Sequence, residues 1–240
     1  MIKKKTNYFD YSKELIFGIF FILPFLFLYE IICFFYFKYE PYQIRNTADI
    51  IIHDFFNVFG QYQQFAYSIS LLVLVFIIYF YSKQSKVYFY INSRFLFLIA
   101  VEGLFFGIIL VLLINNINIF SLENYYHNSL ILNIYLCFGA GIWEEVLFRL
   151  FLYNLILLLF VKIFSESTFF SYFFSILVCS LLFSYFHYIG EGSDVFTFSS
   201  FFFRFLGGVY LTVLYQIRGF GVTCMCHLSY DFILVSLPLI

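Results

Sequence analysis

The stretch of sequence that decides the fold is LILNIYLCFGAGIWEEVLFRLFLYNLILLLFV, residues 130–161. It is predominantly apolar but holds three charged side chains near its middle, Glu144, Glu145 and Arg149. A lipid bilayer is crossed by about 20 consecutive, predominantly apolar residues, so this run is long enough to span one. Each charge near the centre of such a helix costs roughly 2.5 to 3.5 kcal/mol on insertion scales. Three such costs in one run indicate a site that does chemistry or moves an ion.

The composition of the whole chain predicts a membrane protein. Its 240 residues are 63% hydrophobic and 11% charged, and the mean hydropathy is +0.94. Soluble domains are about 45–50% apolar and about 25% charged, so a soluble globular fold is excluded. The formal net charge of −1 gives no indication of an acidic or nucleic-acid partner. All five cysteines lie in apolar segments, and we interpret them as packing residues rather than as a disulfide framework.

Seven uncharged or nearly uncharged runs follow one another along the chain, each about as long as a membrane span. Because a backbone in lipid must satisfy its hydrogen bonds internally, each run is expected to be a helix. The runs are Leu15–Phe37, Phe65–Ser82, Phe95–Ile114, Leu130–Val161, Phe169–Tyr188, Val195–Ile217 and Gly221–Ile240. Gly139 and Gly141 are expected to break the fourth run, so that its helix proper begins near Ile142. The predicted fold is an all-α, polytopic integral membrane protein with about seven transmembrane helices.

The distribution of Lys and Arg predicts the orientation in the membrane. If the N-terminus is cytoplasmic, nine basic residues fall in inside loops, and only Lys38 and Arg45 fall in outside loops. This bias agrees with the rule that cytoplasmic loops are enriched in Lys and Arg. We therefore expect a multi-pass protein of the bacterial cytoplasmic membrane with a cytoplasmic N-terminus and an external C-terminus.

The spacing within the charged stretch separates the two glutamates. Positions i and i+4 share a helix face, so Glu145 is placed to neutralise Arg149. Glu144 is rotated about 140° away from Arg149, since successive residues are about 100° apart. Glu144 therefore lacks a partner on its own helix, and an unpaired carboxyl group in apolar surroundings is suited to general acid or base catalysis. A structural ion pair beside a spectator glutamate is the alternative interpretation.

Two further motifs bring ionisable side chains into apolar runs. Phe183 and His187 share a helix face in FSYFH, residues 183–187, and His227 and Asp231 share one in HLSYD, residues 227–231. Asp231 could orient His227, or share in binding a metal or an oxyanion. Each motif alone also fits a structural role. Since all three helices carry polar groups that need partners, we expect them to meet around one cavity.

The three motifs, E-E-x-x-x-R, F-x-x-x-H and H-x-x-x-N/D in this order, resemble those of the CAAX protease and bacteriocin-processing (Abi, CPBP) family. These are glutamate-type intramembrane proteases, and they include the type II CAAX prenyl endopeptidases. The resemblance covers residues 130–240, and Asp231 stands where the family more commonly has Asn. It implies an endopeptidase that hydrolyses a peptide bond in a membrane-anchored or C-terminally processed protein or peptide.

The same resemblance implies a role for each motif residue. Glu144 would activate a water molecule with help from His187, and His227 with Asp231 would stabilise the oxyanion or hold the water. Glu145 and Arg149 would hold the helix. The residues expected to be catalytic are Glu144, His187, His227 and Asp231, and the supporting residues are Glu145, Arg149 and Phe183.

The chain is accordingly divided at residue 129. Residues 1–129 are expected to hold about three membrane spans and a short interfacial helix at residues 48–60, where apolar side chains are interspersed with Asp49, His53 and Asp54. His53 and Asp54 could be catalytic, but the polar face of an interfacial helix is the simpler interpretation. Residues 130–240 are expected to form the catalytic core, with about four helices surrounding the active-site cavity.

No cofactor is expected, and zinc is the alternative. Glu144, His187 and His227 form a set of ligand types that zinc accepts. The H-E-x-x-H helix of many zinc proteases is absent, however, and C-x-C-H at residues 224–227 matches no standard zinc spacing. The expected partners are the lipid bilayer and a membrane-anchored protein or peptide substrate, and no nucleic acid.

Two other functions compete with proteolysis. A proton-coupled transporter would use the same intramembrane acids and histidines, together with Glu30 and Glu102. It would also be expected to show an inverted repeat with broken helices in matching positions, and we find none in the sequence. A non-enzymatic immunity or partner-binding protein on the same fold is the third interpretation, and retention of every motif residue argues against it.

Overall fold

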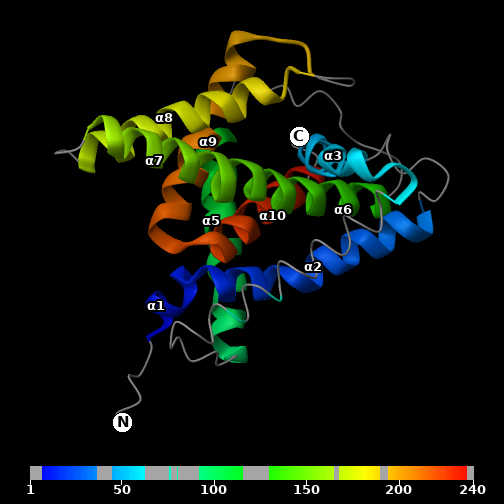
Figure 1. Cartoon of the computed structure of the whole chain (residues 1–240). Helices are drawn as coiled ribbons and strands as arrows, with labels where there is room; N and C mark the ends of the chain where they lie inside the picture. Colours follow the sequence, from blue (N-terminus) through cyan, green and yellow to red (C-terminus); the bar gives the residue numbers. More distant parts are fainter. Residues whose placement is uncertain are drawn as a thin grey trace.

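A computed structural model describes residues 7–36, 45–62, 76, 80, 92–115, 130–164, 168–189 and 194–236 (Figure 1). Every regular element in this part of the chain is a helix, which confirms the all-α prediction. The predicted span Phe65–Ser82 lies outside the described residues, apart from Phe76 and Phe80.

The helices fall into an N-terminal and a C-terminal set. The first set is α1 (Tyr8–Lys13), α2 (Leu15–Tyr36), α3 (Thr47–Asp54), the 3₁₀-helix η1 (Phe55–Tyr62) and α5 (Ser93–Asn115). The second set is α6 (Leu130–Gly139), the π-helical segments η2 (Ala140–Glu144) and η3 (Val146–Tyr153), α7 (Asn154–Ile163), α8 (Thr168–Phe186), α9 (Phe198–Arg218) and α10 (Phe220–Ser236).

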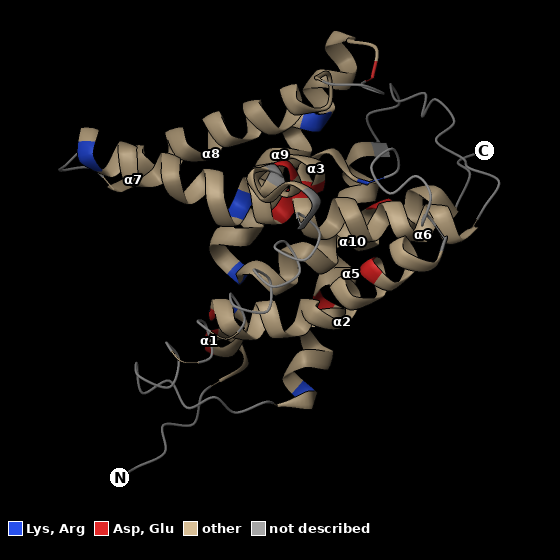
Figure 2. Ribbon diagram, turned by 45° about the vertical axis from the view of Figure 1, so that its right-hand side comes forward, with Lys and Arg blue, Asp and Glu red and all other residues tan. Residues whose placement is uncertain are grey.

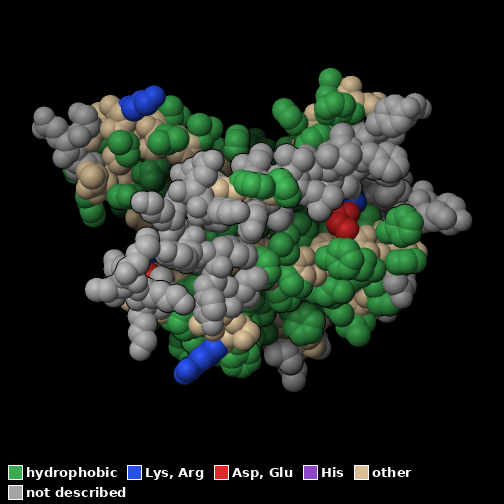
Figure 3. Space-filling model, turned by 60° about the horizontal axis from the view of Figure 1, so that its bottom comes forward, with side chains coloured by type: hydrophobic (Ala, Val, Ile, Leu, Met, Phe, Trp, Pro, Cys, Tyr) green, Lys and Arg blue, Asp and Glu red, His purple; other side chains and the backbone are tan. Residues whose placement is uncertain are grey.

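Five helical stretches of the described chain are long and apolar enough to cross a membrane. They are Leu15–Phe35, Ser93–Ile114, Leu130–Ile163, Thr168–Phe186 and Phe198–Arg218. Helix α10 is apolar as well but has 17 residues, fewer than its predicted run. Hydrophobic side chains also cover most of the described surface of the face in Figure 3. Large exposed apolar areas mark a membrane surface, and these observations confirm the polytopic fold.

Helix α10 lies at the centre of the arrangement. It packs against α2, α5, α9 and η2, which surround it in Figure 1. Helices α7 and α8 run side by side as an antiparallel hairpin, and α8 packs in turn on α9. The N-terminal helices α2 and α5 are thus part of the same packed body as the C-terminal set. The two histidines and the acidic residues of the motifs are brought in by η2, α8 and α10.

The fourth apolar run is continuous, so the break expected at Gly139 and Gly141 does not occur. Gly141 instead permits a close helix contact, because a Cβ atom there would lie only 2.8 Å from the Cβ of Leu228 on α10. A contact this short leaves no space for any larger residue. It places the end of η2, and with it Glu144, directly beside the part of α10 that carries His227.

The short helix expected at residues 48–60 is present as α3 and η1, and two of its polar side chains are turned toward the protein. Asp49 and His53 are buried against the protein, whereas Ile51, Phe55 and Val58 are exposed. An interfacial helix turns its polar face to water and its apolar face to the bilayer. Here the polar face is occupied by protein contacts, and this places α3 within reach of the motif residues.

Candidate active site

The charged motif lies where the helix widens from α to π geometry. Glu144 ends η2, Glu145 follows it, and Arg149 lies within η3. A π-helical segment adds a residue per turn relative to its neighbours, and such segments occur frequently at functional sites. Figure 2 shows acidic residues near the centre of the bundle, by the labels of α9 and α3, with basic residues nearby.

Glu145 is the centre of a fully buried ionic cluster. Its Oε1 accepts a hydrogen bond from Arg149 Nη1 at 2.8 Å and lies 2.7 Å from His227 Nδ1. Glu145 and Arg149 are both inaccessible to solvent. The Arg149 guanidinium also lies 4.5 Å from the centroid of the Phe183 ring, within cation–π distance. The ion pair expected from the i, i+4 spacing is therefore present, and Phe183 packs on the arginine as well as on His187.

Glu144 faces a different set of partners. Its Oε1 accepts a hydrogen bond from the side-chain amide of Asn46 at 2.9 Å. Its Oε2 is buried and accepts no hydrogen bond from any described residue, and it lies 4.0 Å from His187 Nε2. The structure thus brings Glu144 and His187 together, and it separates Glu144 from Arg149 as the helix geometry predicts.

Asn46 was not expected from the sequence at this position. Its Oδ1 accepts a hydrogen bond from the Ala48 backbone N–H, so the same side chain caps α3 and donates to Glu144. Arg45, the residue before Asn46, anchors the N-terminal end of α3 through hydrogen bonds to Glu30 and to Asp49. An Asn at the start of a short helix indicates an N-cap, and this can be read from the sequence. The hydrogen bond from Asn46 to Glu144, 98 positions away, cannot.

His227 and Asp231 lie close together but are not hydrogen-bonded. The distance from His227 Nε2 to Asp231 Oδ2 is 3.6 Å, longer than a normal hydrogen bond. From the sequence, the helices that carry Glu144, His187 and His227 were expected to meet around one cavity. The structure assigns His187 to Glu144 and His227 to Glu145. His227 therefore joins the buried ionic cluster to the more open side of the site, where the Asp231 side chain is 23% exposed.

His187 follows the last residue of α8 and lies beside Glu144 with 27% of its side chain exposed. Burial lowers its pKa to about 4, although the negative charge of Glu144 acts in the opposite direction. His187 is therefore neutral at physiological pH. A neutral imidazole next to a carboxylate can both accept and donate a hydrogen bond.

The alternative zinc set does not fit the described residues. Nowhere in the described ranges do three His, Cys, Asp or Glu side chains gather closely enough to hold a metal ion. Glu144 and His187 form one pair, and His227 turns its Nδ1 to Glu145 instead.

One family model matches the chain. Residues 126–233 match the family described as type II CAAX prenyl endopeptidase Rce1-like. The matched segment holds all three motifs, from Glu144 to Asp231. No curated protein and no solved structure matches the chain. Residues 126–233, a little under half of the chain, are therefore similar to the Rce1-like type II CAAX prenyl endopeptidases, and this match supports a place among the CAAX proteases.

Proposed function

We propose that this protein is an intramembrane endopeptidase in which Glu144 and His187 together activate the attacking water. The observation that carries the proposal is the buried Oε2 of Glu144, which has no hydrogen-bond donor among the described residues and lies 4.0 Å from His187 Nε2. A water molecule about 2.8 Å from each of these two atoms forms normal hydrogen bonds with both. Such a water is held by the two groups that catalysis needs, a carboxylate base and a neutral imidazole.

The contacts of Glu144 suit it to be the base. The amide of Asn46 donates to Oε1 and so fixes the orientation of the carboxyl group, with Oε2 toward His187. Its neighbour Glu145 already neutralises Arg149, and no Lys or Arg among the described residues forms an ion pair with Glu144. In the proposed step Glu144 takes a proton from water while the water oxygen bonds to the carbonyl carbon. The C–N bond then breaks, and the proton passes to the leaving amine.

His227 is placed to stabilise the oxyanion. Its Nδ1 is held by Glu145 at 2.7 Å, whereas its Nε2 lies beyond hydrogen-bond distance of Asp231 at 3.6 Å. When the ring carries both protons, Nε2–H is a donor that can turn to a developing negative oxygen. Asp231, which stands where relatives more often have Asn, adds a carboxylate beside this donor and limits the ring's movement.

The proposed substrate is a membrane-anchored or C-terminally processed protein or peptide. The family supports this class of substrate at a general level, and the position of the site within apolar helices agrees with it. A substrate held in the same bilayer reaches the site by lateral diffusion. Its scissile bond needs to lie close to its anchor.

The test compares the full chain with Glu144→Gln in liposomes that contain a lipid-anchored fluorogenic peptide. Glu144→Gln should lose essentially all turnover while it remains folded. Glu102→Gln, which alters another acid of the membrane helices, should retain turnover per folded molecule. The assay is repeated with a chelator. Turnover by Glu144→Gln at the wild-type rate would refute the assigned base, and loss of wild-type turnover with chelator would refute metal-independent catalysis.

A further inference from the structure

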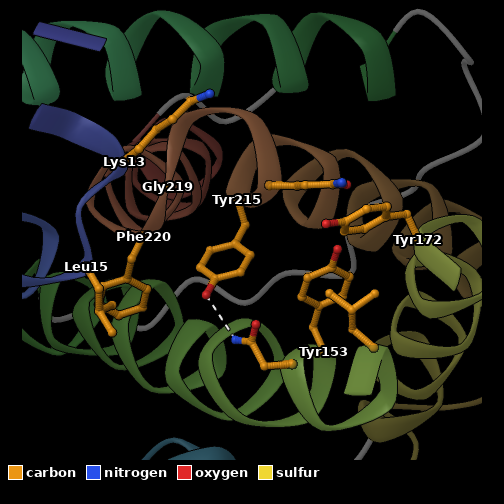
Figure 4. A pocket seen from close by; sticks show the side chains of 10 residues that line it. Lys13, Leu15, Tyr153, Tyr172, Tyr215, Gly219 and Phe220 are labelled. Atoms are coloured by element: carbon orange, nitrogen blue, oxygen red, sulfur yellow. Dashed lines mark hydrogen bonds between the residues drawn. The ribbon is translucent and has the colours of Figure 1, made fainter. Parts of the chain in front are cut away.

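A cavity lined by both polar and apolar side chains lies apart from Glu144 and His187, where α1, α2, α9 and α10 meet η3 and the α7–α8 hairpin (Figure 4). We propose that it binds the anionic headgroup of a phospholipid. The cavity lies at the ends of membrane helices, because Leu15 begins α2 and Gly219 separates α9 from α10. This is the level at which lipid headgroups are found, and three tyrosines line the cavity there, as is typical of membrane interfaces.

The tyrosine hydroxyl groups supply hydrogen-bond donors. Tyr153 is 2% exposed, and its hydroxyl has no hydrogen-bond partner within the described part of the chain. In Figure 4 the hydroxyl groups of Tyr153 and Tyr172 point toward one another across the cavity. A buried hydroxyl without a partner costs stability, and an acceptor that enters the cavity removes this cost. The oxygen atoms of a phosphate are strong acceptors of this kind.

The charge of the lining favours an anion. Lys13 lies at the rim, and it makes no ion pair with the residues that the structure describes. The described lining includes no Asp or Glu, so a phosphate would meet no opposing carboxylate. Gln216 adds a side-chain amide to the lining. A Lys near an anionic membrane surface contributes about 1 kcal/mol of attraction.

The size of the cavity and its surroundings distinguish a lipid from a peptide. The cavity volume is about 220 Å³, below the roughly 300–1,000 Å³ of pockets for drug-sized ligands. It therefore accommodates a compact headgroup rather than a folded peptide. Helix α7, whose Leu157 lines the cavity, also has the exposed apolar residues Leu155, Leu158 and Leu159. Acyl chains attached to the headgroup can lie on these side chains, which a free phosphate ion would not use.

A bound headgroup would also act on the helix that carries the ionic cluster. Tyr215, which lines the cavity, accepts a hydrogen bond from Asn154 at 3.0 Å. The same Asn154 amide donates to the backbone carbonyls of Arg149 and Leu150. The cavity thus contacts the end of η3 directly through Tyr153, its last residue, and Asn154 links it to the two preceding carbonyl groups. Occupancy of the cavity should stabilise this end of η3.

The experiment uses the full chain, delipidated in neutral detergent, and counts retained lipid by native mass spectrometry while Tm is followed. The ligands are phosphatidylglycerol, phosphatidylcholine and inorganic phosphate. Phosphatidylglycerol should remain bound and raise Tm, and the other two should not. Tyr153→Phe should weaken phosphatidylglycerol binding roughly tenfold, and Lys13→Gln roughly fivefold.

Two matched controls lie outside the cavity. Lys162→Gln removes one charge at the far end of α7, and Tyr185→Phe removes one hydroxyl from an exposed position of α8. Both should bind phosphatidylglycerol as the wild type does. Equal binding of phosphatidylcholine would overturn the headgroup assignment, and equal binding of inorganic phosphate would assign a free anion instead. Because Lys13 is exposed, Lys13→Gln tests the site even where Tyr153→Phe alters folding.

Discussion

Substitution of the two adjacent glutamates should separate catalysis from stability. Glu145 and Arg149 are fully buried, and one oxygen of Glu145 serves both Arg149 and His227. Glu145→Gln keeps the shape of the side chain but removes its negative charge, so the guanidinium of Arg149 stays buried without its counter-ion. Removing one partner of a buried ion pair costs about 3–5 kcal/mol. Glu144→Gln keeps the acceptor for the Asn46 amide and leaves no cation unpaired, so its effect should stay within about 1 kcal/mol.

The assay is unfolding of the purified variants in mixed micelles of increasing denaturing detergent, with turnover of a lipid-anchored peptide measured in parallel. Glu144→Gln should unfold close to the wild type and be inactive. Glu145→Gln should unfold at much lower detergent fraction. The double variant Glu145→Gln with Arg149→Met should regain much of the loss, because no buried guanidinium then lacks a counter-ion. Equal destabilisation by Glu144→Gln and Glu145→Gln would refute the assignment of the two glutamates to different partners.

Three further predictions concern single positions around the site. His187 has a pKa of about 4 in the folded chain and about 6.5 in the unfolded chain. At a pH between these two values the unfolded chain binds a proton at this residue and the folded chain does not. The unfolding free energy should therefore fall as the pH drops through this window. His187→Gln should flatten that slope in a plot of Tm against pH, and an unchanged slope would contradict the burial argument. Asn46→Asp keeps the cap of α3 but replaces the donor to Glu144 with a second carboxylate, so its turnover should fall below that of Asn46→Ser, which keeps a cap and adds no charge. Equal turnover of the two variants would contradict the contact. Gly141→Leu should lower stability by at least about 1–3 kcal/mol, seen as a lower Tm, because its side chain would collide with Leu228, and a wild-type Tm would show that the two helices can move apart.

The features that were predictable from the sequence depend on local geometry. The membrane helices follow from run length and composition, and the Glu145–Arg149 pair follows from the i, i+4 spacing. The contacts that complete the site join distant parts of the chain, with 98 positions between Asn46 and Glu144 and 82 between Glu145 and His227. Sequence periodicity carries no information on such pairings.

Two local features also escaped prediction. The π-helical geometry of η2 and η3 depends on how that helix packs, and regular 100° spacing does not reveal it. Gly141 was expected to break the helix because glycine has a low helix propensity. In the structure its missing side chain lets α10 pack closely against this helix. In both cases tertiary packing overrode the local preference.

The contact between Asn46 and Glu144 has a consequence for chimeric proteins. The family match begins at residue 126, so a domain excised there and grafted onto another membrane anchor would keep every motif residue. It would nevertheless lose the amide that faces Glu144, and with it the ionic anchor of α3. Exchange of N-terminal segments between relatives should therefore alter turnover even when the motifs are identical. We therefore expect the N-terminal spans to influence the rate of turnover, and not only to hold the protein in the membrane.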